Sequence, residues 1–266
     1  MPPDVLVDYH AFLQGRDPLK ISDYSGPHSR RDVMECVLFQ QALARGGFPH
    51  SVVMTDIASY GRTILELTSG DIVALGTSAW LSDLENRYHD ILISPPLIRR
   101  GEFEAGLYTA PENEMALQAD SLEKVTALSA VCSRQWQPDW RILEGMGISQ
   151  LLGASTWEVM VHMVGERRAD FLLAPFQPTE GMRLETMNTL LVPIPGLKVH
   201  FPGSRHFGVS RFHPQGRELF EALVRGLQHM RSDGTIARAY TECGFIHPAT
   251  EGWTVLNNGK ADAGRK

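Results

Sequence analysis

The first 76 residues alternate between short apolar runs and longer stretches whose apolar positions recur at helical spacing. Residues 19–26 (LKISDYSG), 51–56 (SVVMTD) and 71–76 (DIVALG) have the pattern of short strands. Residues 30–45 and 59–69 carry apolar side chains on one face and are followed by glycine, which predicts two helices. This alternation is typical of an α/β layer with a parallel sheet.

The rest of the chain repeats the theme. Strands or extended segments are expected at residues 127–133, 169–176, 189–195, 198–202 and 206–212. Helices are expected at about residues 137–147, 156–165, 214–231 and 235–243. Extended segments near 104–110 and 205–210 join two α/β halves, which predicts two lobes connected by two crossover strands.

The order of these elements gives a division into lobes. We place lobe 1 at residues 18–108 and again at 206–255, with lobe 2 at 109–205 between them. The first 17 residues are expected to form a loosely attached lead-in, and the polar tail after Trp253 is expected to fray.

The composition of the chain mainly serves to exclude classes of partner and of protein. The 266-residue chain has a net charge of −6, which disfavours nucleic acid or an anionic membrane surface as the main partner. No apolar run approaches the ~20 residues that a membrane span needs. The N-terminal segment lacks the apolar core of a signal peptide, so we expect either a cytosolic protein or one whose signal peptide has been removed.

The three cysteines, Cys36, Cys132 and Cys243, have neither CxxC nor metal-ligand spacing. We favour three buried, inert thiols. A disulfide between Cys36 and Cys243 is the alternative if the compartment is oxidising.

The end of the chain carries the most specific pattern. In SDGTIARAYTECGF (residues 232–245), Gly234 ends a long helix, Thr235 caps a shorter one and Phe245 packs its end down. Together with the extended piece and helix before it, this segment resembles the C-terminal part of the type II periplasmic solute-binding proteins, the bacterial extracellular solute-binding protein family 3.

Other segments resemble the same family in the same order. NRYHDILISPPL carries Arg87, Ser94 and Pro96 at the positions of the family's Arg, Ser and Pro, and MVHMVGERRADFLLA resembles a segment of its second lobe. The resemblance spans residues 19–245 and implies an α/β, two-lobed fold whose lobes close on a ligand about hinge strands.

The resemblance also implies a function. We expect a periplasmic, monomeric protein that captures a small solute in a cleft between its lobes and delivers it to the permease of an ABC transporter. No catalytic residues, cofactor or metal are expected, since the chain has no Gly-rich phosphate loop, HExxH or GxSxG motif. Two alternatives stay open: the sensor ectodomain of a receptor or kinase, and an enzyme similar to the cyclohexadienyl dehydratases.

In α/β sheets the ligand lies outside the carboxyl ends of the strands, which selects particular loops. The candidate ligand-binding residues of lobe 1 before Arg87 are Tyr24, Ser25, Thr77, Ser78 and Trp80. Tyr24 would cover a ligand, while the hydroxyls and backbone N–H groups around Ser78 would bind a carboxylate. The structural alternatives are a turn with an exposed tyrosine, and a helix cap beside a core tryptophan.

Arg87 is the remaining candidate in lobe 1. In amino-acid binders of the resembling family, the Arg at this position grips the ligand carboxylate. Here the family's preceding Thr is Leu84, and Asp83 lies four residues before Arg87. An ion pair with Asp83 is therefore the alternative to a ligand contact.

In lobe 2 the candidates lie at the ends of two expected strands, 127–133 and 169–176, or at the start of the helix expected at 156–165. They are Ser133, Arg134, Trp136, Ser155, Thr156 and Phe176. An arginine with hydroxyls and backbone donors at a helix start favours an anion. Plain N-capping is the alternative for Ser155 and Thr156.

Pro175 stands where amino-acid binders of the family usually place an Asp for the ligand's ammonium group. Together with the two arginines, this departure favours an anionic or neutral polar solute over an α-amino acid. His162, within an apolar helix, is expected to be a packed core histidine.

Overall fold

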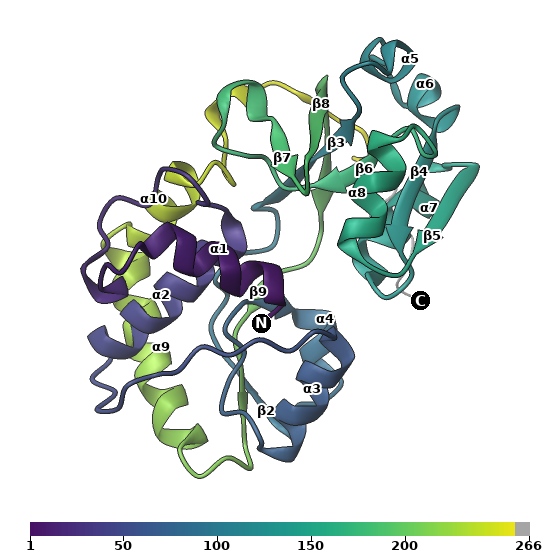
Figure 1. The fold of residues 1–266 in the computed structure, drawn as a ribbon. Coiled ribbons are helices and arrows are strands. Elements are labelled where there is room, and N and C mark those ends of the chain that lie inside the picture. The colour runs from purple at the N-terminus through teal and green to yellow at the C-terminus, as the bar shows by residue number, and fades with distance from the viewer. Residues whose placement is uncertain (259–266) are drawn as a thin grey trace. The chain divides into compact units, whose positions relative to one another are not determined.

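The computed structural model describes residues 1–258, which fall into two units (Figure 1). Unit 1 comprises Met1–Arg100 and Gly203–Phe245, and unit 2 comprises Gly101–Pro202 with the described residues from Ile246 onward. The lobes inferred from the sequence stay a prediction. They differ from these units in assigning residues 101–108 and 246–255 to lobe 1 and residues 203–205 to lobe 2.

Unit 1 is built around helices. Its α-helices are α1 (Pro3–Leu13), α2 (Arg31–Arg45), α3 (Tyr60–Ser69), α4 (Leu81–Glu85), α9 (Gly216–Ser232) and α10 (Thr235–Glu242), and a 3-10 turn η1 spans Pro18–Lys20. Its strands are β1 (Ala79–Trp80), β2 (Ile91–Ile93), β9 (Arg205–His206) and β10 (Gly208–Ser210). β1 pairs with β9 and β2 with β10, both antiparallel.

Helix α2 packs against α9 through backbones that come unusually close. A Cβ added at Gly46 would lie 1.8 Å from the carbonyl oxygen of Ala222, and one at Gly226 would lie 1.8 Å from that of Ala42. Glycine at these two positions therefore permits a close approach of the two helices that any residue with a Cβ would prevent.

The strands expected in the first 76 residues are wrong. Residues 19–26, 51–56 and 71–76 contain no strand, and only Ala74 forms an isolated antiparallel bridge, with Val209. Val53 is 81% exposed, so the apolar run around it lies on the surface and has no partner strand. In the described part of unit 1, the sheets are antiparallel rather than parallel.

The N-terminal lead-in is also a correction. Residues 3–13 form α1, which packs on α2 and buries Val5, Tyr9 and Phe12. These residues recur at intervals of four and three, which places them on one face of a helix. This apolar face packs α1 against α2 and so makes the segment part of unit 1.

Unit 2 combines one larger sheet with a parallel strand pair. Its strands are β3 (Phe103–Thr109), β4 (Ser129–Ser133), β5 (Gln150–Ala154), β6 (Leu172–Ala174), β7 (Leu184–Thr186), β8 (Thr189–Phe201) and β11 (Thr254–Val255). Its helices are α5 (Glu114–Leu117), α6 (Leu122–Thr126), α7 (Gln137–Met146) and α8 (Trp157–Gly165), with 3-10 turns η2 (Glu180–Met182) and η3 (Pro248–Thr250). The sheet order is β11-β8-β3-β6, with β7 on β8, while β4 and β5 pair in parallel.

The core of unit 2 lies where α8 packs on this strand pair and sheet. Met160, Val161 and Val164 of α8 are at most 1% exposed and belong to one buried cluster with Val131 and Leu172. The apolar stripe predicted for this helix is confirmed. The tail expected to fray after Trp253 instead pairs β11 with β8 in parallel; residues 259–266 of that tail lie outside the described part.

The thiols of Cys36, Cys132 and Cys243 are free and buried, as favoured from the sequence. Burial raises the pKa of Cys132 and of Cys243 to about 12, which keeps both thiols protonated at neutral pH. Within residues 1–258, no helix is long and apolar enough to cross a membrane.

Candidate functional site

In unit 1 the donors expected to bind a ligand carboxylate already hold one from the chain itself. The Ser78 N–H donates to Glu35 Oε2 at 2.7 Å, and the Ser78 hydroxyl donates to Glu35 Oε1 at 2.7 Å. Glu35 is fully buried on α2, and Ser78 is 3% exposed. An external solute therefore finds these two donors occupied.

Charged and polar groups surround the Glu35 carboxylate. Arg31 forms an ion pair with it at 2.8 Å, and the Tyr240 hydroxyl donates to it at 3.3 Å. Desolvation acts to lower the pKa of Arg31, but the charges of Glu35 and Asp32 outweigh it and raise that pKa. Burial, reinforced by Glu35, raises the pKa of Tyr240 well above its ordinary value.

Trp80 lies beside the same network. The Arg205 guanidinium lies over its ring, with Cζ 4.7 Å from the centroid, and also donates to the hydroxyl and carbonyl oxygens of Ser78. A Cβ at Gly203 would lie 2.9 Å from the Trp80 ring. Trp80 is 8% exposed, so it acts as a packing residue of unit 1, while Thr77 is half-buried.

Tyr24 differs from both readings of the sequence. It is fully buried, its hydroxyl donates to Gln41 Oε1 at 2.7 Å, and its N–H donates to Glu242 at 2.7 Å. No face of the ring is left for a solute, which corrects the expectation that Tyr24 covers a ligand. Ser25 is exposed, and its hydroxyl donates to Asp23 at 2.6 Å within the turn.

Arg87 is exposed just beyond α4 and forms no ion pair with Asp83 within residues 1–258. Asp83 instead accepts a hydrogen bond from the Tyr60 hydroxyl at 2.9 Å. The alternative of an Asp83–Arg87 pair is therefore wrong, and the Arg87 guanidinium remains accessible.

In unit 2 the parallel pairing of β4 and β5 brings the predicted loops together. Ser133 ends β4 opposite Ala154 at the end of β5, so the segment 134–136 after β4 and the segment 155–157 after β5 leave the same edge. Five of the six lobe 2 candidates are at this edge. They are Ser133, Arg134, Trp136, Ser155 and Thr156.

Arg134 is the exposed cation of this edge. Its Cζ lies 4.5 Å from the ring centroid of Trp140, and its Nε lies 3.3 Å from the position that a Cβ on Gly153 would take. It forms no ion pair within the part of the chain that the structure describes. A guanidinium that is stacked but not neutralised can receive an anion.

Trp157 is a candidate that sequence reasoning missed. Its ring stacks on that of Trp136, with centroids 6.2 Å apart and an interplanar angle of 29°. Both tryptophans are half-buried and pack on the core of unit 2, so each also presents part of its ring outward. The signal was its place directly after Ser155 and Thr156, but the sequence reading assigned it to the apolar stripe.

The remaining lobe 2 candidates divide between capping, packing and accessible positions. The Thr156 side chain caps α8 by accepting from the Val159 N–H at 3.3 Å, as the alternative held. Ser155 is exposed, and Ser133 is 3% exposed. Phe176 is 2% exposed and packs edge-on against Trp253, which corrects its assignment as a ligand contact.

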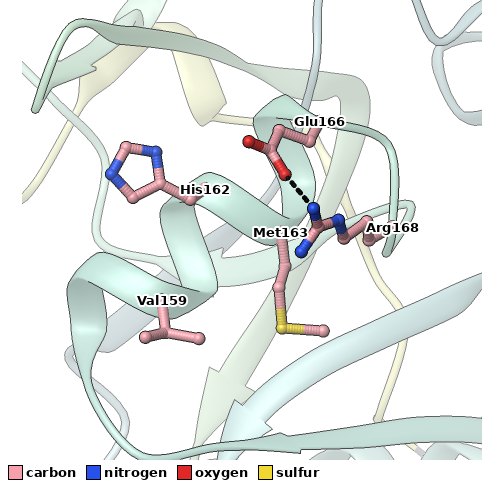
Figure 2. Close-up of a pocket in the computed structure, with 5 residues that line it drawn as sticks. All are labelled: Val159, His162, Met163, Glu166 and Arg168. Carbon is pink, nitrogen blue, oxygen red and sulfur yellow. Dashed lines mark ion pairs between the residues drawn. The ribbon is translucent and has the colours of Figure 1, made fainter.

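Two surface grooves lie elsewhere on unit 2. Figure 2 shows the first, with a volume of about 360 Å³, lined by Val159, His162, Met163, Glu166 and Arg168. His162 is exposed there, so the expectation of a core histidine is wrong. The neighbouring groove, of about 460 Å³, shares His162 and Glu166. Neither groove contains a predicted ligand-binding residue. Within residues 1–258, no group of three or more His, Cys, Asp or Glu side chains could hold a metal ion.

Comparison with known proteins identifies the fold. No protein-family model matches the chain, and no curated protein sequence matches it. Solved structures do match. The VFT2 domain of Bordetella pertussis BvgS, a periplasmic domain, has a TM-score of 0.59 at 13% identity, covering 88% of this chain and 96% of that one.

Two transport proteins match similarly. The probable amino-acid ABC transporter extracellular-binding protein YtmK of Bacillus subtilis has a TM-score of 0.59 at 11% identity, covering 79% of this chain and 86% of that one. The amino-acid ABC transporter substrate-binding protein AbpA of Streptococcus pneumoniae, bound to L-arginine, has a TM-score of 0.55 at 13% identity, covering 82% and 84%. Such identities show the fold alone: the chain has the mixed α/β fold of the type II periplasmic solute-binding proteins, as the resemblance in its sequence implied.

Proposed function

We propose that the protein is a periplasmic solute-binding protein, monomeric, that delivers a small polar solute with an acidic group to a membrane transporter. The observation that carries this proposal is the edge of unit 2 after β4 and β5. There the exposed Arg134 guanidinium, the Ser155 hydroxyl and the stacked rings of Trp136 and Trp157 lie on neighbouring segments. A cation, a hydroxyl and an apolar wall suit an acid with an apolar or planar part.

The structural neighbours favour a different charge for the solute. AbpA is named as bound to L-arginine, and an ancestral protein with a TM-score of 0.54 is named as a cationic amino acid solute-binding protein. A cationic amino acid is therefore the second candidate solute. In this chain it would meet Arg134 with a like charge, and Pro175 offers no carboxylate for its ammonium group.

The delivery step also has a second candidate. The likeness to BvgS VFT2 extends over 96% of that domain, which favours a ligand-binding sensor domain as the alternative to transport. Both functions use the same act of solute binding. The neighbours are named as binding proteins or periplasmic domains, and we propose no catalytic role.

A thermal-shift screen tests the proposal. The panel contains aliphatic and aromatic carboxylates, sulfonates, phosphonates, arginine, other amino acids, polyamines and sugars. A ligand at about 100 times its dissociation constant stabilises a fold by ~2.7 kcal/mol, which a melting curve resolves. We expect acids to raise the melting midpoint. A response to arginine or polyamines alone would overturn the proposed polarity, and a response to no compound would count against solute binding.

A further inference from the structure

The buried carboxylate of Glu35 sits in a cradle assembled from distant parts of unit 1. Its oxygens accept from the Ser78 N–H and hydroxyl at 2.7 Å each, from Arg31 at 2.8 Å and from the Tyr240 hydroxyl at 3.3 Å. Ser78 lies 43 residues from Glu35 in sequence, and Tyr240 lies 205 residues away. The fold, rather than local sequence, thus converges these donors on one carboxylate.

A second arginine, Arg205, binds the Ser78 hydroxyl that donates to Glu35. Arg205 Nε donates to the Ser78 hydroxyl oxygen at 2.9 Å, and its guanidinium is held over Trp80. The Ser78 hydroxyl therefore accepts a hydrogen bond from a cation while it donates one to Glu35. Such polarisation strengthens a donor that faces an anion.

These groups form the kind of site that proteins use for a bound carboxylate. A backbone N–H, a hydroxyl, a guanidinium and a phenol converge on two oxygens from several directions. We propose that unit 1 contains a binding site for a small monocarboxylate, of formate or acetate size, that the chain fills with its own Glu35. Glu35 is thus an internal ligand and a determinant of specificity.

The specificity part rests on the proposed function. Because Glu35 occupies the Ser78 donors, a solute cannot present its own carboxylate to them. The acidic group of the solute must then be held elsewhere, and Arg134 in unit 2 is the exposed, un-neutralised cation of the candidate edge. The occupancy part needs no solute at all, so it can be tested separately.

Chemical rescue provides that test. Glu35→Ala removes the carboxylate but leaves its donors, so formate and acetate are expected to raise the melting midpoint of this variant by several degrees in a saturable manner. Sodium chloride at equal ionic strength supplies the salt control. Leu38→Ala is the matched variant, because Leu38 is also fully buried on α2 but faces no such donors. Equal responses of the wild type, Leu38→Ala and Glu35→Ala to formate would overturn the proposal.

A second pair of variants decides the matter if Glu35→Ala does not fold. Glu35→Asp keeps the negative charge and shortens the side chain, whereas Glu35→Gln keeps the shape and removes the charge. A carboxylate site requires the charge, so Glu35→Asp is expected to melt at the higher temperature of the two. The reverse order would show that shape, and not anion binding, is what the cradle needs.

These outcomes are distinguishable from those of the solute screen. Rescue is measured as the stability of unit 1 in the presence of formate, without any transported solute. If rescue succeeds while the screen yields no ligand, the internal site stands and the proposed function falls. If an acid binds the wild type and formate does not rescue Glu35→Ala, the reverse holds.

Discussion

The guanidinium of Arg134 lies over the indole ring of Trp140, with its Cζ 4.5 Å from the ring centroid. Trp140 is buried in α7, so the contact fixes an otherwise mobile cation at the edge formed by β4 and β5. The ring attracts the positive charge without neutralising it. Arg134 is therefore held in place while its N–H groups stay available to an anion.

Replacing Arg134 with alanine is expected to weaken binding of an acidic solute at least about tenfold, because a charge-assisted hydrogen bond is lost. Isothermal titration with the best acid of the screen measures the change. Arg141→Ala is the matched control, since Arg141 is an exposed arginine within α7, the helix that follows Arg134. Equal affinities of the two variants would remove Arg134 from the site.

Alanine substitutions of Thr156 and Ser155, the two residues before Trp157, are expected to affect different properties: stability for Thr156 and solute affinity for Ser155. Thr156 caps α8, so Thr156→Ala should cost about 1 kcal/mol of unfolding free energy. Ser155 is exposed and does not cap the helix, so Ser155→Ala should leave stability unchanged and lower only solute affinity. Urea unfolding and titration of both variants separate the roles. A stability loss in Ser155→Ala that matches Thr156→Ala would contradict this division.

Docking of the N-terminal helix depends on Arg30. Its guanidinium bonds to Asp4 and Asp8 of α1 at 2.7 and 2.9 Å, and to Asp32 at 3.1 Å. Arg30→Ala should therefore release α1 at a cost of about 1–2 kcal/mol and speed tryptic cleavage after Arg16.

The control for this change is Arg62→Ala, which removes an exposed ion pair with Glu66 on α3. Its loss should cost no more than about 0.5 kcal/mol and leave the rate of cleavage unaltered. If both variants are cleaved at the wild-type rate, apolar packing alone holds α1 in place.

How far the sequence predicts this molecule depends on the range of the interactions involved. The helices at 31–45, 60–69, 157–165 and 216–232 are confirmed, because a helix's hydrogen bonds and apolar stripe are local. The strands expected at 51–56 and 71–76 are wrong, because an apolar run becomes a strand only where a partner pairs with it. The helix around Tyr9 was missed because a general rule about chain ends outweighed its short apolar stripe.

The candidate site shows the same limit. Arg134, Ser155 and Trp136 could be proposed because each directly follows or precedes a recognisable element. The occupation of Ser78 by Glu35 could not, since the two residues are 43 positions apart and Glu35 lies in a helix that also carries other charges. Burial likewise decides against Tyr24 and Phe176, and burial is a property of the whole unit.

The loss of unit 2 stability at acid pH should depend on Asp170. Burial acts to raise the pKa of this carboxyl, but hydrogen bonds from the Ser129 N–H and hydroxyl, at 2.8 and 2.7 Å, and from Asn113 outweigh it and lower the pKa below 3.8. A folded-state pKa below the unfolded value gives stability that is present above the unfolded pKa. That stability is lost as the pH falls through the folded pKa.

Asp170→Asn should therefore unfold at lower urea concentration at neutral pH and show a flatter dependence on pH between about 5 and 3. Urea unfolding at several pH values measures both effects. Glu144→Gln provides the comparison, because Glu144 is an exposed carboxylate on α7 and its removal should leave the slope of the wild type intact. A wild-type slope in Asp170→Asn would mean that other carboxylates govern the acid unfolding of unit 2.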